Sequence, residues 1–194
     1  MTSYCSVADI KLAMPDVTWG SGYDATLTAI AERASRMIDL LTGREDNAYA
    51  ATVGVRRYTA LNSATVRTDE MADLPTRVEI WDGQWSDIAN TDYYVEPINE
   101  TPYNFLVLDT LNGAMSAFPS YPNAVRVTAK FGYSVTPPTP ILQATLTQTV
   151  RWLKRGQHGY QDTGAVAELG QLMYVQALDP DVAAVLDNFR RLAL

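Results

Sequence analysis

The chemistry that this sequence could perform lies in its acidic middle, because general acid–base catalysis needs carboxyl groups held within reach of one substrate. Residues 69 to 109 carry ten acidic side chains against a single basic one. Two spacings would suit an acid and a base, Asp82 with Asp87 and Asp92 with Glu96. A small carbohydrate-active or hydrolytic enzyme is therefore one hypothesis for the chain.

A structural role explains the same residues more simply. Asp82 precedes Gly83, and an Asp-Gly pair between short β-rich runs is typical of a hairpin turn. The only histidine, His158, has no serine motif nearby, and the only cysteine, Cys5, has no partner for a disulfide. These counts argue against zinc sites and Cys/His catalysis, so we expect no cofactor and no metal. We predict that Cys5 is a small buried or interfacial apolar residue.

Aromatic side chains crowd the same middle segment. Such a cluster can stack on sugars or on single-stranded nucleic acid, but stacking platforms for nucleic acid lie in basic grooves. We predict core packing or a protein interface instead, because aromatic residues on strands supply buried area and cross-strand contacts. The cluster consists of Trp81, Trp85, Tyr93, Tyr94, Tyr103, Phe105, Phe118 and Tyr121.

The overall charge argues against DNA as a ligand. With 15 basic and 22 acidic residues the net charge is -7, whereas affinity for duplex DNA comes from lysine and arginine that neutralise phosphates. The sequence has neither a P-loop nor a Gly-x-Gly-x-x-Gly motif, so nucleotide binding has no support.

Length and composition predict a folded protein. The 194 residues are 47% apolar and 19% charged, enough to bury a core without disulfides. The longest uncharged stretch, Phe131 to Val150, contains three prolines and is not expected to span a membrane. The first residues lack the basic and apolar runs of a secretion signal, so we expect synthesis in the cytoplasm.

Periodicity predicts two helices at the start of the chain. Ser6 and Asp9 form a capping-box pattern ahead of a short helix that Pro15 ends. Asp24 is the expected N-cap of a longer helix, whose apolar residues recur every three or four positions until Gly43.

The period changes between Val53 and Tyr133, where short β-rich runs alternate with Asp-Gly, Asn-Gly and proline turns. We expect five or six strands in this segment. The runs are Val53 to Ala60, Thr76 to Trp81, Gln84 to Ile88, Tyr93 to Glu96, Phe105 to Leu108 and Val125 to Phe131.

Helical periodicity then returns twice. Pro138 and Pro140 introduce one helix, and a last helix runs from Asp179 to Leu192 with Asp179 as N-cap and Pro180 at its first position. We expect the two long helices, Asp24 to Leu41 and Pro140 to Arg155, to form a bundle, because each carries an apolar stripe that must be buried.

The elements together predict an α+β fold, a small α-helical bundle with an inserted antiparallel β-domain and a C-terminal helix. The expected divisions are residues 1–52 for the N-terminal helices of the bundle, 53–135 for the inserted β-rich domain, 136–158 for the bundle helix, and 159–194 for a tether and C-terminal docking helix.

A pattern of packing and turn residues recurs along most of the chain. Its stretches are Ala31-Glu32-Arg33-Ala34-Ser35-Arg36-Met37-Ile38-Asp39 leading to Leu41-Thr42-Gly43-Arg44, Thr91 to Pro97, Pro102 to Asp109, Val125 to Tyr133, and Leu178 to Val182 followed by Arg190-Arg191. This arrangement resembles the head–tail connector proteins of tailed bacteriophages, also called adaptor or head completion proteins.

The resemblance implies a structural virion protein without enzymatic activity, located in the neck between capsid and tail. It implies a homo-oligomeric ring, typically of twelve copies, that lies below the portal protein and extends the DNA channel. The ring would dock the next tail or stopper protein, and packaged DNA would only pass through it. Another neck or tail structural protein, such as a stopper or tail terminator, is an alternative, but the flanking helices favour the connector.

The resemblance also implies that the last helix engages the portal. A helix of this length is marginal alone, so its apolar stripe must lie on a partner. That partner is either its own subunit, or the portal or a neighbouring subunit. We expect the portal or a neighbouring subunit, with the preceding segment, Gly156 to Leu178, as an extended tether. The implied portal interface consists of Val182, Val185, Leu186, Phe189, Arg190, Arg191 and Leu192.

Overall fold

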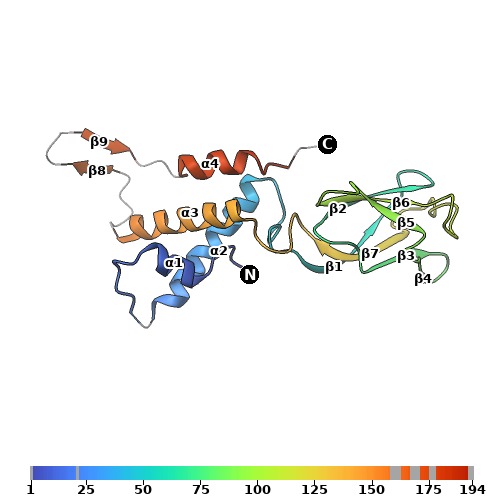
Figure 1. Cartoon of the computed structure of the whole chain (residues 1–194), viewed down its shortest axis with the longest axis horizontal. Helices are drawn as coiled ribbons and strands as arrows, with labels where there is room; N and C mark the ends of the chain where they lie inside the picture. The colour runs from blue at the N-terminus through green and yellow to red at the C-terminus, as the bar shows by residue number, and fades with distance from the viewer. Residues whose placement is uncertain (1, 21, 158–162, 167–170, 175–177, 192–194) are drawn as a thin grey trace. The chain divides into compact units, whose positions relative to one another are not determined.

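A computed structural model describes residues 2–20, 22–157, 163–166, 171–174 and 178–191. These residues form four helices and nine strands, which confirms the predicted α+β fold. The chain divides into two compact units (Figure 1). The helical unit combines Met1–Asp46 with Pro137–Leu194, and the β-unit is Asn47–Thr136.

The first helix, α1 (Val7–Ala13), has the predicted capping box. The Asp9 N–H donates to Ser6 Oγ over 3.1 Å, and the Ser6 N–H donates to Asp9 Oδ2 over 2.8 Å. These two bonds satisfy donors that a helix N-terminus would otherwise leave unpaired. The Ser6 hydroxyl, which donates to Asp9 Oδ2 over 2.7 Å, and the Ser6 N–H together hold the pKa of the Asp9 carboxyl below its usual range.

The second helix, α2 (Tyr23–Leu41), has Gly22 and not Asp24 as its N-cap residue. The predicted N-cap at Asp24 is therefore wrong by two residues. Asp24 lies inside the first turn, where a carboxylate is favourable toward the helix dipole, and it ion-pairs with Lys11 Nζ at 2.6 Å. The predicted end is confirmed, because Gly43 takes a φ of +69° beyond the last turn.

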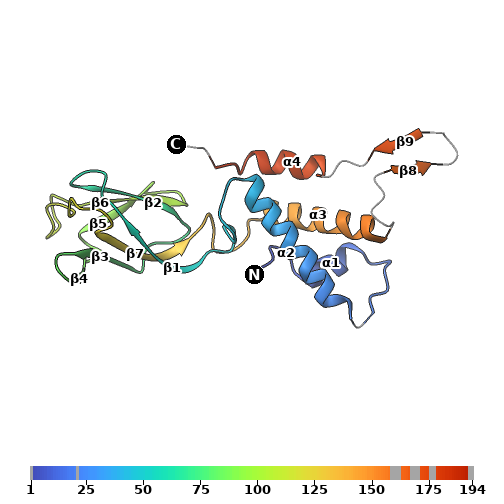
Figure 2. The same ribbon diagram turned by 180° about the vertical axis from the view of Figure 1, so that it is seen from behind.

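The third helix, α3 (Thr139–Gln157), packs against α1 and α2. Figures 1 and 2 show the three helices together from opposite sides. The expected pairing of the two long helices is confirmed, and their apolar stripes meet in one core. That core contains Cys5, Ile10, Met14, Leu27, Ala31 and Leu153, with Leu142, Leu146 and Val150 packed on it.

The last helix, α4 (Pro180–Asp187), starts as predicted, with Asp179 Oδ1 accepting from the Asp181 N–H over 3.0 Å, but ends before Leu192. It lies alongside α3 in both views (Figures 1 and 2). Asp179 Oδ2 pairs with Arg151 Nη1 on α3 at 2.6 Å. The structure thus corrects the expectation that this helix finds its partner outside its own chain. Within the expected tether, β8 (Thr163–Val166) and β9 (Gln171–Tyr174) pair antiparallel.

The β-unit contains one curled antiparallel sheet with the strand order β4-β3-β7-β2-β6-β5, and β1 pairs with β7. Its core contains Val66, Met71, Val78, Ile88, Val95, Leu106, Leu108, Phe118, Val125, Val127 and Ala129. The strands are β1 (Thr52–Tyr58), β2 (Thr65–Met71), β3 (Arg77–Trp81), β4 (Trp85–Asp87), β5 (Tyr93–Glu96), β6 (Tyr103–Leu108) and β7 (Val125–Phe131).

One strand, β2, was not among the predicted runs. Its sequence is polar and acidic, and its register on β6 shifts between Arg67 and Met71. This irregularity breaks the two-residue alternation that marks a half-buried strand. Val66, Thr68 and Met71 nevertheless point into the interior and are buried.

The chain enters and leaves the β-unit through a hydrogen-bonded clamp. The Ala48 carbonyl accepts from the N–H groups of Tyr133 and Ser134 over 2.7 and 3.1 Å, and the Ala51 N–H donates to the Ser134 carbonyl over 3.0 Å. The Tyr49 ring, which is fully buried, contacts the Tyr133 ring with centroids 5.3 Å apart. The two ends of the β-unit are therefore held side by side.

Candidate interaction surfaces

The first proposed catalytic pair serves the turn and the sheet. Asp82 lies in the turn of the β3–β4 hairpin, where its Oδ1 accepts from the Gln84 N–H over 3.3 Å and Gly83 takes a φ of +108°. This confirms the predicted hairpin turn. Asp87 forms an ion pair with Arg77 Nε at 2.6 Å. Both carboxylates therefore have structural partners.

The second pair is divided between a buried and an exposed residue. Asp92 is 9% exposed, and its Oδ1 accepts from the Ala114 N–H over 3.0 Å, which organises the loop after β6. Glu96 is exposed at the end of β5. Among the described residues, no group of three or more histidine, cysteine, aspartate or glutamate side chains could hold a metal ion. His158 lies outside the described residues.

Three carboxyl groups of the β-unit have pKa values below their usual range. Hydrogen bonds from Lys130 and from Asn112 hold the pKa values of Asp73 and Asp109 below the usual range, and Arg126 does the same for Glu79. A general acid at neutral pH needs a raised pKa instead. These acids are stabilised as carboxylates, which is the behaviour of structural groups.

Glu79 on β3 is the most deeply buried of these carboxylates, at 2% exposure. Arg126 on β7 donates to it from two nitrogens, with Nε 2.6 Å from Oε2, and Arg77 Nη2 lies 3.3 Å from Oε1. Arg126 and Glu79 are direct cross-strand partners. The paired guanidinium compensates the cost of burying the carboxylate.

We expect Glu79→Gln to lower the unfolding free energy of the β-unit by about 1–3 kcal/mol at pH 7, because Arg126 keeps its charge but loses the carboxylate that pairs with it. The folded-state pKa of Glu79 is depressed, so its stabilisation is present above the ordinary glutamate pKa and is lost as pH falls through the folded value. Urea unfolding at pH 7 and pH 3 should therefore show the difference from wild type shrinking in acid. Glu100→Gln, on an exposed loop, is the matched control and should change neither curve.

Some residues of the aromatic cluster pack in the core and others are exposed on the surface. The prediction of core packing or a protein interface is compatible with both positions. Phe118 is buried at 4% exposure, and Tyr93 and Tyr103 pack on the same core. Trp81 and Trp85 pair across the β3–β4 hairpin with centroids 5.3 Å apart. The guanidiniums of Arg57 and Arg126 lie 5.0 and 4.3 Å from the Trp85 ring, and Trp81, Tyr94 and Tyr121 remain exposed.

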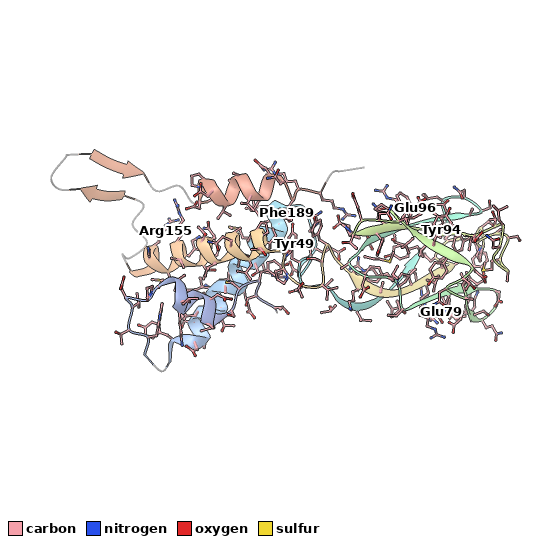
Figure 3. All side chains as sticks on the ribbon, in the orientation of Figure 1. Tyr49, Glu79, Tyr94, Glu96, Arg155 and Phe189 are labelled. Atoms are coloured by element: carbon pink, nitrogen blue, oxygen red, sulfur yellow. The ribbon has the colours of Figure 1, made fainter. Side chains whose placement is uncertain are left out.

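The β5 edge of the β-unit carries an apolar depression of about 350 Å³ with one carboxylate. Its lining residues, which we call the acidic patch, are Glu96, Pro97, Ile98, Asn104 and Phe105. Glu96 and Phe105 are direct cross-strand partners, and Ile98 is 64% exposed. Figure 3 labels Tyr94 and Glu96 on one side of the β-unit and Glu79 on the other.

The helical unit carries a depression of similar size, about 320 Å³, between α2 and α3. Its lining residues, which we call the basic pocket, are Ile30, Arg33, Trp152 and Arg155. Each helix contributes one apolar side chain and, three residues later, one arginine, and residues three apart lie on the same face of a helix. Sequence reasoning missed both surfaces, because their residues come together only in the folded chain.

The implied portal interface is only partly accessible. Val182 and Leu186 are 1% and 2% exposed within the chain. Val185 and Phe189 are half-buried, and the exposed members are Arg190 and Arg191. Arg190 Nε pairs with Asp187 at 3.1 Å, and the Arg191 N–H donates to the Thr42 carbonyl over 2.8 Å. Leu192 lies outside the described residues.

Comparison with known proteins gives the fold a precedent. No protein-family model and no curated protein matches the sequence. The solved neck of an empty GTA particle, computed with C6 symmetry, contains a chain that is 14% identical, with a TM-score of 0.64 over 98% of this chain and 91% of that one.

Two further structures agree over the whole chain. The neck of the native GTA particle, computed with C12 symmetry, matches at 15% identity and a TM-score of 0.57, covering 100% of this chain and 94% of that one. The virion of the native gene transfer agent particle matches at 16% identity and a TM-score of 0.52, covering 100% and 96%. This chain therefore has the fold of proteins in the neck and virion of these particles. In the described part of the chain, no helix combines the length and apolar character needed to cross a membrane.

Proposed function

We propose that this protein is a head–tail connector, or adaptor, that forms a homo-oligomeric ring below the portal and extends the DNA channel. The observation that carries the proposal is a fold shared over 98% and 100% of the chain with two structures of particle necks, computed with C6 and C12 symmetry. The sequence independently resembles the connector family. The protein acts as a structural component without catalysis, is made in the host cytoplasm, and is located in the virion neck.

The ring in this proposal has twelve copies and contacts the portal on one side and a tail or stopper protein on the other. The portal contact uses the accessible side of the C-terminal segment, including Arg190 and Arg191, while Val182 and Leu186 hold α4 on its own subunit. In this arrangement α4 is already folded and packed on its own subunit before the portal binds. It does not fold only when it contacts the portal.

Electron microscopy of the protein mixed with the portal protein of the same particle tests this proposal. We expect twelvefold rings stacked on the portal vertex. Arg190→Glu with Arg191→Glu should prevent stacking but leave the monomer folded by circular dichroism. Lys154→Glu, which changes an exposed charge on α3, is the matched control. Rings that stack on a tail component and never on the portal would support a stopper or tail terminator instead.

A DNA channel should let its duplex pass, so we expect the isolated protein to give no mobility shift of duplex DNA at about 0.15 M salt. The net charge is -7, and Arg56, Arg77, Arg126 and Lys130 of the β-unit are already paired with carboxylates. Submicromolar binding that weakens steeply with salt would contradict the passive channel.

A further inference from the structure

We propose that the basic pocket of one copy receives the acidic patch of the next copy, so that the ring closes through this head-to-tail contact. The inference rests on the proposed function, because it assigns the subunit contact of the proposed ring. Its occupant is a second copy of this chain. Each surface belongs to a different compact unit, so one copy can offer both at once.

Ring closure requires two different, mutually complementary surfaces on each subunit, because a single self-complementary surface gives a dimer. The two depressions meet this requirement. Both are about equally large and apolar in part, but one carries two guanidiniums and the other carries one carboxylate. Their charges are therefore complementary to each other and not to themselves.

The basic pocket has the composition of an energetically important contact. Tryptophan and arginine are enriched among residues that dominate binding energy, and Trp152 lies beside Arg33 and Arg155. Arg33 is exposed and makes no ion pair within the described part of the chain. Figure 3 labels Arg155 on α3 of the helical unit. A carboxylate entering this pocket would find a cation and an apolar wall together.

The acidic patch offers such a carboxylate. Glu96 is exposed, pairs with no cation among the described residues, and lies beside the exposed side chain of Ile98. Arg67, which is opposite Phe105 on β2, lies outside the patch. Burial of Glu96 in an uncharged contact would be costly, whereas burial against Arg33 would compensate it. Charge pairing of this kind also selects the correct partner surface.

Cross-linking tests the contact directly, and the native cysteine does not interfere. Cys5 is 3% exposed, and burial raises the pKa of its thiol to about 11, so it reacts slowly with maleimides at neutral pH. We expect the double variant Arg33→Cys/Glu96→Cys, treated with a short bismaleimide, to give a covalent ladder that ends at the full ring. Each single variant should remain monomeric on a denaturing gel.

The outcomes separate the inference from the proposed function. Rings that form normally but yield no ladder would overturn the head-to-tail contact and leave the connector proposal standing. Dimers from Glu96→Cys alone would indicate a self-complementary contact and would also overturn it. Absence of any ring, for the wild type alone and with the portal, would overturn both.

Charge reversal supplies a second readout in the same assembly. We expect Arg33→Glu or Glu96→Arg to raise the protein concentration needed for ring formation by about tenfold or more. The combination of both changes should restore assembly to within about threefold of wild type, because the pair is re-formed with opposite signs. Lys154→Glu is the control and should assemble normally. Failure of the double variant to recover, with both single variants folded, would contradict the pairing.

Discussion

Gly132→Ala is expected to lower the unfolding free energy of the β-unit by about 3–5 kcal/mol, the sum of backbone strain and a steric clash. Gly132 has a φ of +146°, which side chains rarely adopt. An added Cβ would lie 2.6 Å from the Ala48 carbonyl oxygen and 3.0 Å from the Ala51 Cβ. The carbonyl cannot retreat without breaking its bonds to Tyr133 and Ser134.

Chemical unfolding followed by tryptophan fluorescence measures this effect, since Trp81 and Trp85 lie in the β-unit. Gly83→Ala is the matched control, because Gly83 has a φ of +108° but no atom within 4 Å of an added Cβ. It should cost only the backbone strain, about 1–2 kcal/mol. An equal loss of unfolding free energy in the two variants would mean that the Ala48 carbonyl moves aside at little cost, and would contradict the predicted steric clash.

Leu186→Ala is expected to lower the unfolding free energy of the helical unit by about 2–4 kcal/mol. Leu186 is 2% exposed on the face of α4 that packs toward α3, so truncation leaves a cavity inside the chain. Thermal unfolding of the unassembled protein measures the loss. Ala184→Ser, at an exposed position of the same helix, controls for changes in helix propensity.

Hydrogen exchange on the same unassembled protein extends this test. Slow exchange across Val185 to Arg190 is expected, because docked helices open rarely. Rapid exchange, together with an unchanged melting temperature for Leu186→Ala, would show that α4 does not stay on α3. That result would restore the sequence-based expectation of a helix that docks only on a partner.

Local rules predicted the elements whose determinants lie close together in the chain. Ser6 and Asp9 are three residues apart, and their capping box forms as expected. The Asp82-Gly83 turn depends on two neighbours. The apolar stripes of the two long helices were readable because packing faces repeat every three to four residues.

Contacts between distant residues explain what the sequence could not reveal. The segment from residue 69 to 109 contains a single basic residue, but the sheet brings Arg56, Arg126 and Lys130 from outside that segment beside its carboxylates. The strand β2 was missed because its pairing is irregular and its sequence polar. The apolar stripe of a helix shows that the helix packs against another element, but it does not show which element. For α4 that element is α3.

The candidate surfaces were hidden for the same reason. Arg33 and Arg155 are 122 positions apart in the numbering, yet they line one pocket because α2 and α3 pack together. Arg190 and Arg191 were expected in the last turn of the final helix, but α4 ends at Asp187, so both arginines follow the helix. The sequence also could not show that Val182 and Leu186 are buried within the chain, because that depends on how α4 packs on α3.

The clamp at Ala48 makes the β-unit a replaceable module. The segments at which the chain enters and leaves the β-unit are hydrogen-bonded to each other. The β-unit is therefore inserted into the sequence of the helical unit as one closed loop. The entropy of closing a loop grows only slowly with its length, by about 0.6 kcal/mol for each doubling. Insertions, deletions or a different β-sheet between residues 52 and 131 can therefore change the surface of the β-unit while the helical unit keeps its stability.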